Sequence, residues 1–394
     1  MDVARLRAET PGCALGAHFN HSGSSLQSTA TVSAITDHLQ RESFYGGMEA
    51  AAAVADRIAT ARADAEALLG AQPGEVAFAT SGSAAFGLVF AALPRLAAGD
   101  RILVGRQEWG GNLATMRAAA DRAGALIETI PCRADGSVDA AALANMIDGR
   151  VRLVSVTWLP ANGGLINDVA AVGRVTRAAR VPFFVDAGQA LGQMPVDVAA
   201  IGCDMLKGAC RKYLRGPRGT ALLYVRKDFA ERLEPPFLDV QSGPWVGDGP
   251  AARRDARVFE TVEGSVALLL GLGVALKQAR AIGLPAIRAR IRMLADGLRA
   301  RLACIRGVTL RDLGTEGSGL VSFTVDGMQP QDVRVHLAQA KIAVGANGVP
   351  YTPLDMTARG LTEIVRASVS YINTEEEIDR LADALRGLSR AAAA

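Results

Sequence analysis

Cysteine, histidine and lysine are scarce in this sequence, and each scarcity narrows the possible function. The cysteines are scattered, odd in number and free of C-x-x-C pairs: Cys13, Cys132, Cys203, Cys210 and Cys304. A disulfide framework or a zinc site is therefore not expected. Two of the four histidines, His18 and His21, have helical spacing, but two imidazoles without a nearby carboxylate or thiolate predict no metal site.

Long apolar runs and an excess of one charge are also absent. The apolar runs are shorter than a membrane span and are interrupted by glycine or followed by charge, so no transmembrane helix is expected. Residues 1–7 lead into no apolar region, which predicts no secretory signal and a cytoplasmic location. Lys and Arg total 43 against 40 for Asp and Glu, a net charge of +3 without a basic run, so nucleic acid is not an expected partner.

The order of apolar patterns predicts an α/β fold. Between about residues 57 and 225, helical stretches alternate with short β-rich runs, which is typical of a mostly parallel sheet flanked by helices. The expected strands are 76–79, 101–104, 152–158, 182–186 and 221–225. The expected helices include 50–69, 84–96, 111–123, 139–147 and 169–179.

A stretch rich in helix and strand breakers, residues 235–250, interrupts this alternation. Beyond it we expect long helices at 264–282 and 285–303, a strand at 319–325, and a final strand and helix at 365–371 and 374–388. The sequence thus predicts a large domain over residues 16–258 and a smaller α+β domain formed by residues 1–15 and 259–394.

Three common catalytic or phosphate-binding motifs are missing: G-x-G-x-x-G after a strand, G-x-x-x-x-G-K-[ST] and G-x-S-x-G. Lys212 is the first positive clue, because it is one of only five lysines and has Arg211, Arg215 and Arg218 around it. Neighbouring positive charge disfavours the ammonium form and favours the neutral amine needed for imine formation. A solvated basic loop, between a helix-like segment and the strand that follows, is the alternative.

Two further segments suggest a bound cofactor. Asp186 ends the apolar run that starts at Pro182, and a carboxylate at a strand end can pair with a pyridinium nitrogen. A capping Asp before a turn is the alternative. Phe78–Ser83 runs from a strand through small residues into a helix, where amides and hydroxyls suit a phosphate.

Taken together, these segments resemble fold-type-I pyridoxal 5′-phosphate (PLP) enzymes of the class V aminotransferase and cysteine desulfurase group, from about His18 to Leu388. The motifs that carry the resemblance are Val185-Asp-Ala-Gly-Gln189, Arg211-Lys-Tyr-Leu-Arg-Gly-Pro-Arg-Gly219 and Val365-Arg-Ala-Ser-Val-Ser-Tyr-Ile-Asn-Thr-Glu375. The second motif looks most like the C–S lyases of ergothioneine biosynthesis and like isopenicillin-epimerase-like members.

The resemblance assigns roles to individual residues. Lys212 would hold PLP as a Schiff base, Asp186 would pair with the pyridine nitrogen, and Gln189 would contact the phenolic oxygen. The other implied cofactor contacts are Gly82, Ser83 and Arg211 at the phosphate, Trp109 over the ring and Asn162 near the phenolic oxygen. The implied substrate contacts are Arg366, which would clamp the α-carboxylate, and His21, Ser22 and Tyr351.

One departure from the group narrows the reaction. Cysteine desulfurases need a nucleophilic cysteine on a loop that resembles residues 345–355 here, and this segment contains none. Ala209 also stands where relatives carry a Ser or Thr at the phosphate. We therefore expect a PLP-dependent lyase that acts on a β-substituted amino acid, such as a cysteine S-conjugate, through a Cα carbanion.

Three alternatives remain open: a class V aminotransferase, an amino-acid epimerase, or a non-catalytic PLP-binding protein. The resemblance also implies a homodimer, in which residues 259–265 reach the partner's phosphate.

Overall fold

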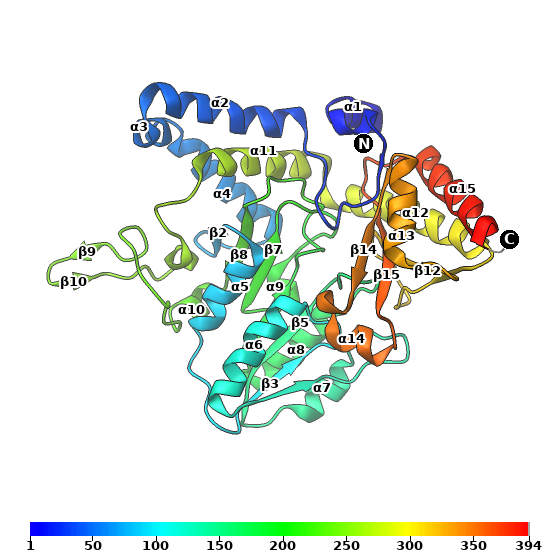
Figure 1. The fold of residues 1–394 in the computed structure, drawn as a ribbon. Coiled ribbons are helices and arrows are strands. Elements are labelled where there is room, and N and C mark those ends of the chain that lie inside the picture. Colours follow the sequence, from blue (N-terminus) through cyan, green and yellow to red (C-terminus); the bar gives the residue numbers. More distant parts are fainter. Residues whose placement is uncertain (393–394) are drawn as a thin grey trace.

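The computed structural model describes residues 1–392, and its largest element is a seven-stranded sheet (Figure 1). Its strands lie in the order β2-β8-β7-β6-β5-β3-β4. Their bounds are β2 Val76–Ala79, β3 Arg101–Val104, β4 Leu126–Thr129, β5 Val151–Thr157, β6 Phe183–Asp186, β7 Met205–Ala209 and β8 Ala221–Val225. Neighbouring strands from β7 to β4 are parallel, whereas β8 is antiparallel to both β7 and β2.

Helices cover both faces of this sheet, as its nearly continuous apolar strands require. Phe183 and Val185 pack into one core with helices α4, α7, α8 and α9, while Phe184 packs into another with α5 and α6. Successive residues of a strand point to opposite faces. The helix bounds are α4 Ala55–Leu69, α5 Gly82–Ala91, α6 Gly110–Ala123, α7 Ala140–Met146, α8 Val169–Ala179, α9 Val198–Ile201 and α10 Lys227–Ala230.

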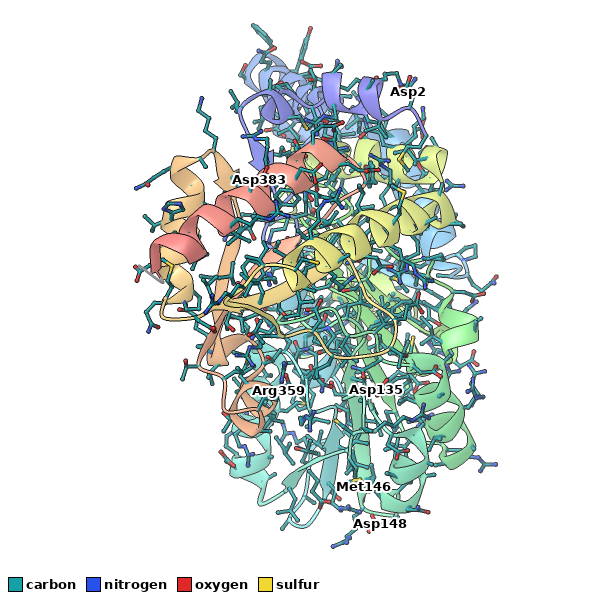
Figure 2. All side chains as sticks on the ribbon, turned by 90° about the vertical axis from the view of Figure 1, so that its right-hand side faces the viewer. Asp2, Asp135, Met146, Asp148, Arg359 and Asp383 are labelled. Carbon is teal, nitrogen blue, oxygen red and sulfur yellow. The ribbon has the colours of Figure 1, made fainter. Side chains whose placement is uncertain are left out.

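A second, four-stranded antiparallel sheet has the order β11-β12-β15-β14. Its strands are β11 Val308–Leu310, β12 Leu320–Val325, β14 Gly345–Gly348 and β15 Glu363–Ser368. Helices α12 and α15 lie along this sheet, as the side view shows (Figure 2). The helices of this half are α12 Leu284–Ala303, α13 Pro330–Gln339, α14 Pro353–Ala358 and α15 Glu375–Ala392.

The N-terminal segment lies beside the small sheet, and helix α11 lies on the side of the large sheet. β1, Ala17–His18, pairs with β13, Ile342–Ala343, in a separate parallel pair beside the small sheet. Helix α11, Val266–Ile282, packs against α2 and α4 on the side of the large sheet. The remaining elements are α1 Val3–Ala8, α2 Thr29–Tyr45, α3 Gly47–Ala52, the pair β9 Trp245–Val246 and β10 Gly249–Pro250, and the 3₁₀ turns Pro11–Ala14, Ala256–Phe259 and Val349–Tyr351. The boundaries 16–258 and 259–394 stay a proposal.

Most expected elements are present, and one expectation near the site was wrong. The residues before Lys212 form strand β7 instead of a helix-like segment, because they pair with β6 and β8 in the middle of the sheet. No single helix in the described part of the chain is long and apolar enough to cross a membrane. Only α11 and α12 taken together, bent by 80°, meet such a criterion.

Candidate active site

Three polar side chains lie side by side at or near the carboxyl ends of the central strands. Thr157 of β5, Asp186 of β6 and Lys207 of β7 are register partners across the sheet. They continue the strand face that carries Phe184 and Met205, which is the face covered by α5 and α6. Ligands of open α/β sheets bind at this edge, and the site is built here.

Lys212 follows β7 by three residues and is held in a tight turn, where its carbonyl oxygen accepts the Arg215 N–H at 2.9 Å. Arg215 has a left-handed φ of 62°. Burial lowers the pKa of the Lys212 amine to about 7, and the nearby positive charge of Lys207 acts in the same direction. Near neutral pH a large share of Lys212 is therefore the uncharged amine, the form that attacks a carbonyl group.

Two adjoining cavities meet at Lys212. One has a volume of about 300 Å³ and the other of about 290 Å³. Both are lined by Trp109, Gln189, Arg211 and Lys212. We call the first the sheet cavity and the second the small-domain cavity.

The sheet cavity is suited to a phosphorylated ring. Helix α5 starts at Gly82 beside Ser83, so its first amides face a site where an anion is stabilised. Arg211 and Arg218 line the same cavity, and neither pairs with a carboxylate in the part of the chain that the structure describes. Ala209 lines it too, without a hydroxyl to offer. The groups of this cavity that could hold a phosphate are therefore the start of α5, the two arginines and the hydroxyls of Thr80, Ser81 and Thr220.

Asp186 and Gln189 are polar residues of the sheet cavity that could contact the ring itself. Burial raises the pKa of Asp186, but Lys207, Lys212 and the Gly188 N–H together hold it below the usual value. Gln189 is 4% exposed and its Oε1 has no hydrogen-bond partner among the described residues. An unpaired buried amide is unfavourable unless a ligand completes it. The Gln189 Nε2 donates to the Ser22 carbonyl oxygen at 3.3 Å, and the second N–H of that amide could serve a ring oxygen.

The small-domain cavity contains a buried cation that pairs with no carboxylate among the described residues. Arg366 of β15 is 4% exposed, donates to the Ala161 carbonyl oxygen at 2.7 Å, and has an unpartnered Nε. Burial lowers its pKa to about 10. A desolvated guanidinium with free N–H groups matches a carboxylate ligand.

Two aromatic rings cover the junction of the cavities. The Lys212 Nζ lies 5.7 Å from the centre of the Trp109 ring, and the rings of Trp109 and Tyr351 are 5.5 Å apart. A Cβ on Gly110 would collide with the Pro350 carbonyl oxygen. Glycine at the start of α6 therefore allows the segment that carries Tyr351 to lie against it.

Two predicted contacts are not brought to these cavities. The Asn162 amide donates to the Gly348 carbonyl oxygen and to Thr352 Oγ1, each at 3.0 Å, and its neighbour Ala161 lines the sheet cavity instead. His21 is fully buried with its Nδ1 2.9 Å from Ser25 Oγ. Neither is among the described residues that line a cavity, whereas Ser22 is. Asn162 is therefore one residue away from the cavity lining, and its contact with the phenolic oxygen stays a prediction.

Sequence reasoning missed three buried polar residues at the sheet cavity: Lys207, which lines it, and Glu108 and Asn112 behind Asp186. Asn112 donates to both Glu108, at 2.8 Å, and Asp186, at 2.9 Å. Lys207 pairs with Asp186 at 2.7 Å. The only available clues were the i, i+4 spacing of the first two around Trp109 and the rarity of lysine.

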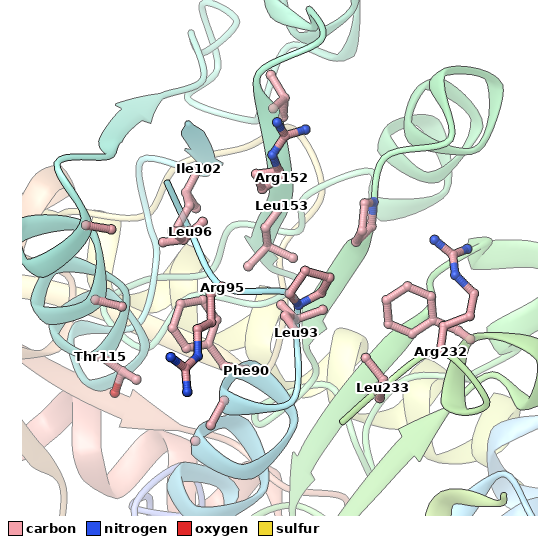
Figure 3. A pocket seen from close by; sticks show the side chains of 18 of the residues that line it. Phe90, Leu93, Arg95, Leu96, Ile102, Thr115, Arg152, Leu153, Arg232 and Leu233 are labelled. Atoms are coloured by element: carbon pink, nitrogen blue, oxygen red, sulfur yellow. The ribbon is translucent and has the colours of Figure 1, made fainter. Parts of the chain in front are cut away.

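Another cavity lies at the opposite end of the strands. It has a volume of about 790 Å³ and is lined near the amino ends of β3 and β5 by Ile102, Arg152 and Leu153 (Figure 3). None of the predicted site residues lines it. Its position at the amino edge of the sheet separates it from the site described above.

None of the five cysteines is among the described residues that line the sheet cavity or the small-domain cavity. Cys210 is buried two residues before Lys212, and burial raises its pKa to about 12. Cys304 is exposed and caps helix α12. A thiol with a raised pKa is a poor nucleophile.

The fold, a low-pKa lysine, a strand-end aspartate and a helix start suited to a phosphate are together those of a fold-type-I PLP enzyme. The model of the family "Aminotransferase class-V" matches residues 18–381. The chain belongs to this family, and its cofactor is PLP.

The chain is similar to two kinds of curated relative. It is 32% identical over 384 residues to the probable hercynylcysteine sulfoxide lyase of Mycobacterium tuberculosis (strain CDC 1551 / Oshkosh), covering 97% of this chain and 92% of that protein. It is 32% identical over 298 residues to a probable cysteine desulfurase of Xylella fastidiosa (strain 9a5c), covering 75% of this chain and 70% of that protein.

Solved structures share the fold. An apo cysteine desulfurase from Thermococcus onnurineus NA1 superposes with a TM-score of 0.92 at 24% identity and 98% coverage of both chains. The cystine C–S lyase C-DES, in complex with its product cysteine persulfide, superposes with a TM-score of 0.87 at 25% identity, covering 96% of this chain and 99% of that one.

The pKa of Lys212 predicts how the apoprotein captures PLP. Raising the pH through about 7 deprotonates this amine, so the rate of covalent capture, followed by visible absorbance, should rise with a midpoint near pH 7. Lys207→Met removes a positive charge that lowers the Lys212 pKa, and the midpoint should move to higher pH. A midpoint that is unchanged in this variant would contradict the electrostatic account.

Proposed function

We propose that the protein is a PLP-dependent α,β-lyase that acts on a β-substituted amino acid such as a cysteine S-conjugate. The observation that carries this proposal is Arg366, a buried guanidinium without a carboxylate partner in the described chain, in a cavity that Lys212 also lines. A buried unpaired cation is costly, so the site is organised for an anionic group. The α-carboxylate of an amino acid supplies that group.

The chain's own residues would orient the substrate and move its protons. Arg366 would hold the α-carboxylate by paired N–H donors, which fixes the direction of the Cα–H bond. Lys212, once its amine is free, would remove the Cα proton and return a proton to the departing group. Trp109 and Tyr351 would limit water at the junction. PLP, when bound, supplies an electron sink for the charge that develops at Cα.

Elimination is favoured over persulfide transfer by the absence of a thiol. In a persulfide mechanism a cysteine must reach the substrate's sulfur, and none of the described residues that line either cavity is a cysteine. A probable hercynylcysteine sulfoxide lyase and a cystine C–S lyase are among the proteins similar to this chain, which supports a lyase. In this chain the β-substituent would leave with the bonding electron pair, and hydrolysis of the remainder would yield pyruvate and ammonium.

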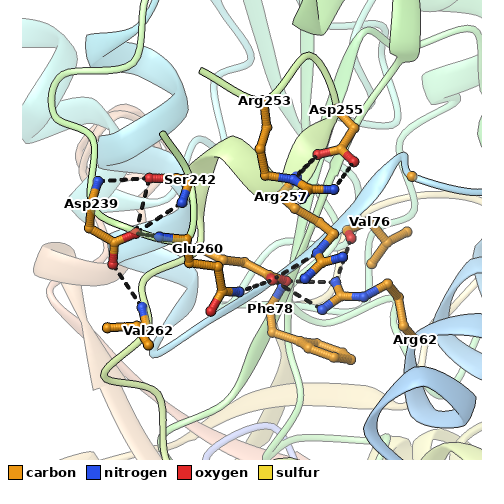
Figure 4. Close-up of polar contacts among 12 residues, drawn as sticks. Arg62, Val76, Phe78, Asp239, Ser242, Arg253, Asp255, Arg257, Glu260 and Val262 are labelled. Atoms are coloured by element: carbon orange, nitrogen blue, oxygen red, sulfur yellow. Dashed lines mark hydrogen bonds and ion pairs between the residues drawn. The ribbon is translucent and has the colours of Figure 1, made fainter. Parts of the chain in front are cut away.

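We also propose that the enzyme works as a homodimer in the cytoplasm. Residues 259–265 line a cavity of about 1190 Å³ that shares Thr80, Gly219 and Thr220 with the sheet cavity. This segment is anchored by Glu260, which pairs with Arg62 at 2.6 Å and accepts the Phe78 N–H at 2.7 Å (Figure 4). A partner segment that entered this opening would come close to the phosphate-binding end of the sheet cavity.

The test is a stoichiometric one. Holoenzyme is incubated separately with cysteine, cysteine S-conjugates, their sulfoxides and alanine, without any keto acid, and pyruvate, ammonium and, for cysteine, alanine are measured. We expect many equivalents of both products from a substrate with a β-leaving group and none from alanine. The Lys212→Ala variant is the matched control and should release neither.

Any of four other results would contradict the proposal that the protein is a lyase. Turnover that stops after one equivalent and resumes with a keto acid would identify a transaminase. Loss of Cα configuration without pyruvate would identify an epimerase. Alanine formed from cysteine together with a protein-bound persulfide would identify a desulfurase, and no reaction across the panel would favour a non-catalytic PLP-binding protein.

A further inference from the structure

A buried charge network extends from Asp186 and Lys207, which line the sheet cavity, to Glu108 and Asn112, which do not. Its members are almost entirely shielded from solvent: Glu108 at 0%, Asn112 at 1%, Asp186 at 3% and Lys207 at 5% exposure. Lys207 Nζ lies 2.7 Å from Asp186 Oδ2, and the Asn112 amide bridges the same oxygen to Glu108 Oε1. Two carboxylates and an ammonium group thus share one water-poor region.

The hydrogen bonds leave Asp186 one free acceptor position. A carboxylate offers about four lone-pair positions. Oδ2 accepts from Lys207 and Asn112, while Oδ1 accepts the Gly188 N–H at 2.8 Å. A Cβ on Gly188 would lie 2.9 Å from Oδ1 and 3.5 Å from Lys212 Nζ. Glycine therefore keeps this side of Oδ1 open, toward the lysine that would hold the cofactor.

A protonated ring nitrogen at Oδ1 would change the charge of this region. Asp186 and Lys207 cancel each other, so a pyridinium would add an uncompensated positive charge in a medium where isolated charges are costly. Glu108 can supply the second negative charge. Burial and the charge of Asp186 raise its pKa to about 7, although hydrogen bonds from Asn112, Ser155 and Thr157 oppose that rise.

We propose that Lys207 and Glu108 are positioning residues that set the proton affinity of the PLP ring nitrogen through Asp186, with opposite signs. Pairing with Lys207 makes Asp186 a weaker hydrogen-bond acceptor, which lowers the proton affinity of the ring nitrogen. Glu108, connected through Asn112, compensates the pyridinium charge and raises it. The inference rests on the proposed assignment of Asp186 to the ring nitrogen and holds whichever reaction follows.

The other charged groups around this network do not produce the same pattern. Arg211 and Arg366 also act on the site electrostatically, but both stay charged when Lys207 or Glu108 is replaced. The Lys212 amine, whose pKa depends on Lys207, would be bound to the cofactor in the holoenzyme that the experiment uses. Thr157 and Ser155 contact Glu108 from β5 without a charge of their own. An opposite response of the two variants is therefore specific to the network.

The experiment measures protonation of the ring nitrogen directly. Holoenzyme is loaded with PLP labelled with ¹⁵N in the ring, and the ¹⁵N chemical shift is followed against pH. The midpoint should move up by about one pH unit or more in Lys207→Met, and down by a similar amount in Glu108→Gln. The double variant should return toward the wild-type midpoint.

Control variants separate the possible failures. Asp186→Asn should remove the protonated form at neutral pH, and an unchanged shift there would reject the assignment of Asp186 itself. The network proposal alone is overturned if Asp186→Asn changes the ¹⁵N shift while the Lys207 and Glu108 variants keep the wild-type midpoint. It is also overturned if the ¹⁵N shift of the wild type and of these two variants does not change with pH. Lys207→Gln keeps a hydrogen-bond donor without the charge and replaces Lys207→Met if that variant does not fold. Exposed Lys277→Met should leave the midpoint unchanged.

Discussion

Replacement of Lys212 by alanine is expected to abolish the covalent attachment of PLP and to lower turnover by on the order of 10³-fold or more. Lys212 is the amine that both cavities share, and its pKa of about 7 makes the neutral form accessible. Borohydride reduction followed by peptide mass mapping should locate the cofactor on Lys212 in the wild type and nowhere in the variant.

A second buried amine, Lys207, is the alternative attachment site that this measurement tells apart from Lys212. Lys207 lines the sheet cavity as well, but its Nζ is paired with Asp186. Cofactor fixed to Lys207 in the wild type would contradict the assignment, even if the Lys212→Ala variant were inactive. Lys277→Ala, on the exposed side of α11, is the matched control and should retain both attachment and turnover.

Replacement of Arg366 by glutamine is expected to reduce kcat/KM for an amino-acid substrate by roughly 10²-fold. The variant loses the charge and the paired N–H geometry that would hold the α-carboxylate. Arg366→Lys should recover only part of this loss, because an ammonium group lacks the planar arrangement of donors. Steady-state kinetics with the preferred substrate of the panel measure both effects.

Arg334 provides a matched control, since it lines the same cavity from the exposed side of α13. Arg334→Gln removes the same charge and should change kcat/KM much less. A substrate analogue without the carboxylate should react equally poorly with the wild type and with Arg366→Gln. Equal losses in the two arginine variants would show a general electrostatic effect instead of a clamp. Thermal unfolding and PLP content verify that Arg366→Gln remains folded, because its contact with Ala161 is also lost.

The strand-end residues could be predicted because their positions follow from local patterns. An apolar run that stops at Asp186, together with three motifs of the class V family, indicated the cofactor and the fold. Strands 76–79, 101–104 and 221–225 coincide with β2, β3 and β8. A strand buried on both faces is nearly all apolar, and that composition is visible in a single sequence.

The contacts that were missed depend on how distant segments meet. Lys207 pairs with Asp186 only because β6 and β7 are adjacent in register, and a sequence does not state strand order. Ala161 lines the sheet cavity and Asn162 does not, because the path of the turn after β5 decides which side chain faces the cavity. His21 points toward His18, with ring centres 4.8 Å apart, an arrangement fixed by the packing of the N-terminal segment.

The hydrogen bond from Arg366 to the Ala161 carbonyl oxygen has a mechanical consequence. It joins β15 of the small sheet to the turn that follows β5 of the large sheet. A hinge rotation that separated the sheets at this point would have to break it, and would expose the guanidinium in the same movement. Arg366, which would bind the substrate, thus also connects the two sheets. An anion bound to Arg366 would therefore act on the same side chain that holds the sheets together at this point.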